Sequence, residues 1–138
     1  MSMDLRQREP RSVDSEYKGW IARLPCVACY VLKGRIHRLV QVAHCRIADS
    51  EAGWRSVGMA EKPHDRRCTP LCHLHHQNGP RQTCQHKMDE RVFWADVLGV
   101  SIFQLVADLN DAFDRGQSGD AVIARHAARG ALVLRERA

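Results

Sequence analysis

The stretch Pro70-Leu71-Cys72-His73-Leu74-His75-His76 decides how this chain folds, because it pairs with an earlier motif, Cys26-Val27-Ala28-Cys29. A Cys-x-x-Cys pair forms a tight knuckle, and residues three apart, such as Cys72 and His75, share one face of a short helix. The two pairs together give a Cys3His ligand set for zinc. Four protein ligands leave no open coordination position, so this zinc would be structural. Buried free thiols are the alternative, but two pairs with matching spacing favour zinc.

Further histidines surround this ligand set. His76 directly follows His75, and adjacent helical residues point about 100° apart, so His76 is free for a second site. His86 could return beside His76 after a turn, while His44 approaches from the end of a predicted strand. Two imidazoles on a divalent ion would leave positions for water and phosphate, and the third would suit a general base at neutral pH. His73 is an alternative to His76 as the metal ligand.

The composition limits the class of protein. A chain of 138 residues forms one domain with a modest core, which a bound metal would help to stabilise. The net charge of +5 favours a polyanionic partner. No apolar run is long enough for a membrane span, and the N-terminus lacks the apolar core of a signal peptide, so we expect a cytoplasmic protein. In such a protein, six cysteines and eight histidines indicate metal binding rather than disulfides.

The spacing of apolar residues predicts helices on both sides of a metal-rich middle segment. The first helix begins at Ser12 or Asp14 and stops at Pro25. Its apolar positions are Tyr17, Trp20, Ile21 and Leu24. In the middle segment, Val40, Val42 and His44 alternate onto one face of a predicted strand. A long connection over residues 45–69 follows.

The C-terminal part is predicted to be helical. One helical segment covers residues 91–98, and a capping box at Ser101 and Gln104 opens a helix that ends near Gly116. A weaker helix follows over residues 120–129. We therefore expect an α+β fold with a flexible leader over residues 1–11, a metal-binding domain over residues 12–116, and a weak helix and tail over residues 117–138.

In this order the motifs resemble a known family. They are Cys26-x-x-Cys29, Ala43-His44 with Arg46, a glycine-containing loop with Gly58-Met59, Lys62-Pro63 and Asp65-Arg66, the PLCHLHH stretch, and Arg91-Val92-Phe93-Trp94 with Leu98-Gly99. The pattern is similar to the phage-encoded HNH-type nucleases, above all to the small prophage HNH proteins and the recombination-enhancing Ref group. The resemblance covers about residues 20 to 110.

The resemblance implies a zinc-stabilised ββα-metal core (a His-Me finger) with flanking N- and C-terminal helices, so that residues 12–116 would be the nuclease domain. His44 matches the catalytic histidine at the end of the first hairpin strand. His76 and His86 match the ligands of the catalytic divalent ion, for which Mg²⁺ or Mn²⁺ is expected, although imidazoles also bind Zn²⁺ or Ni²⁺. The residues that match the structural zinc ligands are Cys26, Cys29, Cys72 and His75.

The implied activity is metal-dependent hydrolysis of phosphodiester bonds in DNA, or alternatively RNA, inside a bacterial or phage-infected cell. His44 would take a proton from water while the metal polarises the phosphate. Lys62, Arg66 and Arg67 are candidates for contacts to backbone phosphates, which position nucleic acid without reading its sequence. A monomer is the default, although the C-terminal apolar stripe could bury against a second copy.

Two other classes of function stay open. A zinc-stabilised module that binds DNA or a protein partner and cuts nothing explains the charge and the Cys3His set equally well. A second metal site would distinguish the nuclease from such a module. A thiol-based redox protein built on Cys26-x-x-Cys29 would need a βαβ context that the sequence lacks. The other cysteines, Cys45, Cys68 and Cys84, receive no role.

Overall fold

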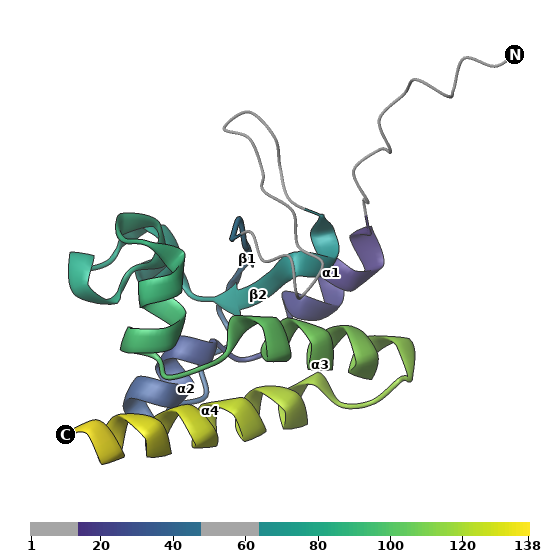
Figure 1. Cartoon of the computed structure of the whole chain (residues 1–138). Helices are drawn as coiled ribbons and strands as arrows, with labels where there is room; N and C mark the ends of the chain where they lie inside the picture. Colours follow the sequence, from purple (N-terminus) through teal and green to yellow (C-terminus); the bar gives the residue numbers. More distant parts are fainter. Residues whose placement is uncertain (1–13, 48–63) are drawn as a thin grey trace, which may run out of the picture.

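The computed structural model describes residues 14–47 and 64–138, in which helices surround one two-stranded antiparallel sheet (Figure 1). The main elements are α1 (Ser15–Ile21), α2 (Val27–Lys33), β1 (Gln41–His44), β2 (Cys68–Leu71), α3 (Ile102–Asp114) and α4 (Gly119–Arg137). Short helical segments are η2 (Asp65–Arg67), η3 (Leu74–Asn78), η4 (Arg81–Thr83), η5 (Gln85–Lys87) and η6 (Val92–Val97). The mixture confirms the α+β class. The predicted leader over residues 1–11 lies outside the described residues.

The predicted strand before His44 is confirmed as β1. It pairs with β2 in a register that places His44 opposite Cys68 and Ala43 opposite Thr69. Ala43 is buried in the core, while His44 faces the other side and is partly exposed. The prediction that residues 45–69 form one connection is wrong at its end, because Cys68 and Thr69 belong to β2. A strand of four residues that contains a proline gives little sequence signal.

The N-terminal ends of α1 and α3 agree with the predicted caps, whereas α1 ends at Ile21, before the predicted stop at Pro25. The Asp14 carboxylate accepts a hydrogen bond from the Tyr17 N–H, and the Ser101 hydroxyl accepts one from the Gln104 N–H. After α3, Gly116 adopts a left-handed φ of 67°, as residues that follow a helix end commonly do. The predicted helix over residues 91–98 is confirmed in η6.

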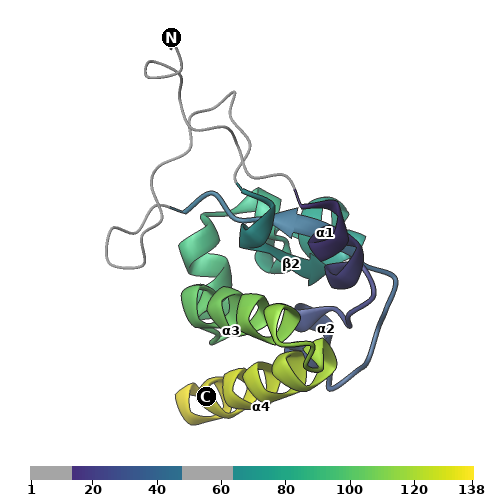
Figure 2. The same cartoon turned by 90° about the vertical axis from the view of Figure 1, so that its right-hand side faces the viewer.

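The last helix is longer than the predicted segment over residues 120–129, because α4 continues to Arg137. It lies beside α3 and also packs against α2, as Figures 1 and 2 show from two directions. The close approach of α4 to Leu98, just after η6, depends on Gly130, because a Cβ at this position would stand only 2.5 Å from the Leu98 carbonyl oxygen. The glycine that weakens the helical signal in the sequence is thus what lets α4 dock.

A single hydrophobic core joins the sheet to the surrounding helices. Its largest fully buried side chains include Tyr17, Phe93 and Trp94, from α1 and η6. Among the described residues, none of the helices combines the length and the apolar character that crossing a membrane requires. The core includes residues of α2, β1 and β2, and η3 follows β2 after Cys72 and His73, so the elements that carry the candidate zinc ligands lie next to one another.

Candidate metal centre and histidine cluster

The predicted zinc ligands converge. The ligand atoms of Cys26, Cys29, Cys72 and His75 all lie within 4.8 Å of one another, and all four residues are buried. Cys26 caps the N-terminus of α2, and Cys29 lies in that helix. Cys72 directly follows β2, and the His75 N–H donates to the Cys72 carbonyl, so a single turn of backbone brings both side chains to the same point.

The distances fit a tetrahedral zinc site. Bonds of about 2.3 Å to sulfur and about 2.05 Å to nitrogen imply edges of about 3.8 Å between sulfurs and about 3.5 Å between sulfur and nitrogen. The Cys29 and Cys72 sulfurs are 3.8 Å apart. From His75 Nδ1, the Sγ atoms of Cys29, Cys26 and Cys72 lie at 3.6, 3.9 and 3.1 Å. This buried cluster could therefore hold a structural metal such as zinc.

The surroundings of the cluster suit thiolates that are neutralised by a cation. Burial raises the pKa of Cys26 to about 12 and also raises that of Cys29, so negative charge here needs a metal partner. Cys26 Sγ accepts hydrogen bonds from the backbone N–H groups of Cys29 and Cys72, at 3.5 and 3.3 Å. Burial lowers the pKa of His75, which favours the neutral imidazole that a metal requires.

The structure also brings His44, His76 and His86 together on the neighbouring elements β1, η3 and η5. The rings of His76 and His86 meet edge to face with centroids 4.6 Å apart. Burial, followed by repulsion from His86 and His44, lowers the pKa of His76 to about 4. His76 is therefore neutral at neutral pH. Its Nδ1–H donates to Gln41 Oε1 at 2.7 Å, which leaves Nε2 with a free lone pair.

Asp65 is the site residue that the sequence analysis missed. Its fully buried carboxylate accepts from His44 Nε2–H at 3.0 Å and from the Asp14 N–H at 2.8 Å, and Lys18 Nζ lies 3.6 Å away. A carboxylate at Nε2 fixes the tautomer of His44 and leaves its Nδ1 able to accept a proton. The sequence signal was present in the Asp65-Arg66 pair, but nothing local connects Asp65 in η2 to a histidine on β1.

No protein-family model matches the chain. No match was found among curated proteins or among solved structures.

Arg66, one of the predicted phosphate contacts, lies between α1 and α3. Its guanidinium pairs with Asp14 and Asp114, both at 3.0 Å. It also stacks 4.7 Å from the ring centroid of Tyr17 and 5.0 Å from that of Phe113. Arg66 thus ties two helices to the segment that carries Asp65, and its contact with phosphate stays a prediction.

The remaining predicted residues are placed as follows. The Arg67 carbonyl accepts the Cys45 N–H at 2.8 Å, next to the end of β1. Lys62 lies outside the described residues. Cys45, Cys68 and Cys84 are fully buried and lie outside the Cys3His cluster. They are core residues, and Cys68 Sγ donates to the Asp65 carbonyl at 2.8 Å.

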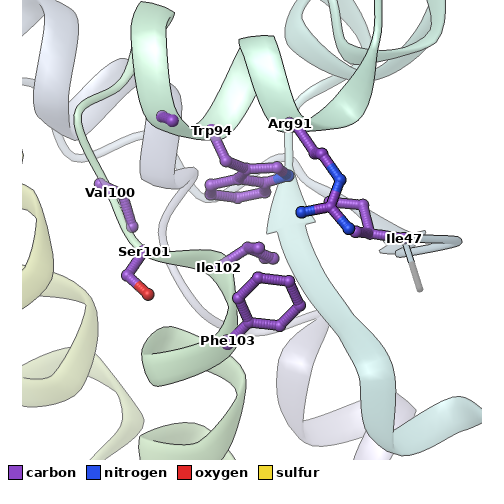
Figure 3. Close-up of a pocket in the computed structure, with 8 residues that line it drawn as sticks. Ile47, Arg91, Trp94, Val100, Ser101, Ile102 and Phe103 are labelled. Carbon is purple, nitrogen blue, oxygen red and sulfur yellow. The ribbon is translucent and has the colours of Figure 1, made fainter. Parts of the chain in front are cut away.

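A pocket of about 260 Å³ opens between η6 and the start of α3 (Figure 3). Its lining residues are Ile47, Arg91, Trp94, Ala95, Val100, Ser101, Ile102 and Phe103. The side chains are mostly apolar, and these residues include no histidine, cysteine or carboxylate. This pocket therefore offers none of the imidazole, thiol or carboxylate groups that lie around β1 and η3.

Proposed function

We propose that this chain is a metal-dependent endonuclease of the HNH type. It would hydrolyse phosphodiester bonds with His44 as the general base. One observation carries the proposal: His44 is held through Nε2 by a buried carboxylate and belongs to a cluster with His76 and His86. A base that is fixed through one nitrogen can use the other to take a proton from water. The net charge of +5 supports a nucleic acid as the substrate, with DNA as the expectation.

The order of elements supports the ββα-metal core that the sequence resemblance implied. The antiparallel pair β1 and β2 is followed by η3, which carries His76. His44 comes from the end of β1, so a strand and a helical segment supply the proposed base and the proposed metal ligand. His86 from η5 then completes the pair of imidazoles.

The residues of the chain would divide the chemistry as follows. His44 Nδ1 accepts the proton of the attacking water, and the Asp65 carboxylate stabilises the imidazolium that forms. His76 and His86 would hold a divalent ion, Mg²⁺ or Mn²⁺, with Gln41 fixing the tautomer of His76. When bound, the ion would polarise the phosphate and stabilise charge on the leaving oxygen. The zinc of the Cys3His cluster would have no part in the reaction.

Cleavage of supercoiled plasmid tests the proposal. With Mg²⁺ or Mn²⁺ the wild type should nick the plasmid, and His44→Ala should abolish nicking while it keeps its zinc and its melting temperature. The exposed His73 provides a matched variant, since His73→Ala should retain activity and His76→Ala should lose it. If His44→Ala cleaves like the wild type, His44 is not the base.

The second candidate is a zinc-stabilised module that binds DNA or a protein and cuts nothing. It is favoured by one observation: within residues 14–47 and 64–138, the Cys3His set is the group of at least three ligands that meets tightly enough for a metal. Absence of cleavage with every divalent ion tried, with DNA still retarded on a gel, would select this module over the nuclease.

A further inference from the structure

The loop over residues 34–40, between α2 and β1, exposes two large apolar side chains. Leu39 is 81% exposed and Ile36 is 58% exposed, which makes them the most exposed large hydrophobic residues in the described part of the chain. Single exposed apolar residues are ordinary on protein surfaces. Two of them on one short loop indicate a contact surface when the loop is held in one conformation.

One anchor of this loop is the zinc cluster. The Cys26 N–H donates to the His37 carbonyl at 2.8 Å, and the Arg35 N–H donates to the Cys29 carbonyl at 3.3 Å. His37 Nδ1 also lies 3.6 Å from Cys29 Sγ. Both cysteines are proposed zinc ligands, so the metal centre and the loop are fixed to each other.

The other anchor is α4. The Arg38 guanidinium bonds both carboxylate oxygens of Asp120, at 3.1 and 2.7 Å, and donates to the Arg23 carbonyl at 3.1 Å. The loop is therefore ordered before any partner binds. Ordering in advance removes part of the entropic cost of binding, which is what a recognition element needs.

The charge around the loop points to a polyanion. From Tyr17 to Ile47 the sequence contains no Asp or Glu, and the basic residues over this range are Lys18, Arg23, Lys33, Arg35, Arg38 and Arg46, of which Lys18 pairs with Asp65 and Arg38 with Asp120. Lys33 and Arg35 are exposed on either side of Gly34. Exposed cations next to exposed apolar side chains match a nucleic-acid groove, in which phosphates line the edges and base steps lie between them.

The loop is close to the candidate active site. It leads directly into Gln41, the first residue of β1, whose side chain bonds His76. An extended chain from Leu39 to His44 spans about 17 Å at most, which is about half a turn of duplex DNA. One duplex could therefore contact the loop and present a phosphodiester bond to His44.

We propose that residues 34–40 form a DNA-contacting wedge: Leu39 and Ile36 enter the minor groove at a base step, and Lys33 and Arg35 contact the flanking phosphates. The inference rests on the proposed function only in taking duplex DNA as the partner. The inference adds the surface that binds the duplex and the distortion of the duplex on binding. Apolar wedges of this kind partly unstack a base step and bend the helix.

The test uses zinc-loaded full-length protein that carries His44→Ala, so that binding is measured without cleavage. The probe is a short duplex that contains 2-aminopurine, whose fluorescence rises when its base step unstacks. Leu39→Ser with Ile36→Ser should weaken binding about tenfold in fluorescence anisotropy and remove the 2-aminopurine signal. Leu132→Ser is the matched control, because Leu132 is also an exposed leucine, at 48%, and belongs to α4 rather than to the loop. Lys33→Ala and Arg35→Ala should each reduce the salt slope of binding by about 1.

The outcomes separate this inference from the proposed nuclease. If the loop variants bind like Leu132→Ser, the wedge is overturned, and plasmid cleavage by the wild type still tests the nuclease. If the serine variants convert a dimer to a monomer in sedimentation and leave DNA binding unchanged, the loop is a self-association surface and the wedge is also overturned. Weaker binding with intact cleavage of bis-(p-nitrophenyl) phosphate by the same variants in the His44 wild-type background supports the wedge.

Discussion

At the scale of single residues, a substitution of Asp65 tests what the buried carboxylate adds to His44 while the imidazole itself stays in place. In Asp65→Asn the side chain keeps its size but cannot stabilise an imidazolium, so we expect plasmid nicking to slow about 10- to 100-fold. Nicking rates with zinc content and melting temperature check this. Asp111→Asn is the control, because Asp111 pairs with Arg115 on the surface of α3 rather than with a histidine. An Asp65→Asn rate equal to that of the wild type would contradict the role.

Gln41 is expected to act on His76 in the same way. Gln41→Leu removes the acceptor of the His76 Nδ1–H, so the ring can take the other tautomer, and we expect Mn²⁺ to bind the zinc-loaded protein about tenfold more weakly. Gln41→Glu keeps an acceptor and should restore binding. Calorimetry measures the affinity, and ¹⁵N shifts of the His76 ring report its tautomer. Wild-type affinity and an unchanged tautomer in Gln41→Leu would show that this hydrogen bond has no such effect.

The sequence could predict residues whose partners are close along the chain. Cys26 with Cys29 and Cys72 with His75 are local pairs, and the fixed coordination geometry of zinc predicts that the two pairs meet. Asp65 and Gln41 could not be found in this way. Each bonds a histidine 21 or 35 residues away, and a carboxylate or amide on a short segment carries no local sign of such a partner.

At the scale of elements, Asp14 determines where α1 begins. Asp14→Ala removes the cap and the Arg66 pair, and we expect the free energy of unfolding to fall by about 1 kcal/mol. The Tyr17 N–H lowers the pKa of Asp14 below its ordinary 3.8. Because the pKa of Asp14 is lower in the folded than in the unfolded protein, the ionised carboxylate stabilises the folded state above pH 3.8. This stabilisation is lost as the pH falls through the lowered pKa. Urea unfolding across pH should show a full difference at neutral pH and a shrinking one in acid.

The control for this prediction is Asp111→Ala, which removes an exposed pair with Arg115 and should change stability by less than about 0.5 kcal/mol. Equal effects of the two substitutions would mean that the cap contributes nothing beyond surface charge.

The elements differ in how well the sequence predicts them. The caps of α1 and α3 are local signals, and both helices were predicted. The resemblance implied a second hairpin strand, but the local pattern did not locate β2, because its stability comes from pairing with β1 across a long connection. The full length of α4 was missed because Gly130 interrupts a helical pattern, and its benefit is visible only where α4 meets the Leu98 carbonyl.

At the scale of the whole molecule, the Cys3His cluster joins α2 to the end of β2 and to η3. A structural zinc contributes on the order of 10 kcal/mol, as much as the whole stability of many small domains, which is about 5–15 kcal/mol. Chelation should therefore abolish cooperative thermal unfolding, as followed by circular dichroism. Cys72→Ser should lose stoichiometric zinc, whereas Cys84→Ser should keep it, because Cys84 is buried outside the cluster. A metal-free protein that melts like the zinc-loaded one would contradict this.

His75 and His76 are consecutive, so one short helical segment serves the zinc cluster with one imidazole and the candidate catalytic cluster with the next. During synthesis, Cys29 emerges from the ribosome 43 residues before Cys72. The tetrahedron cannot close, and His76 cannot take its place, until both have emerged. Under the proposed function, a nascent chain is thus expected to be inert toward the messenger and the chromosome around it, and a cell that withholds the metal would keep the finished chain inert as well.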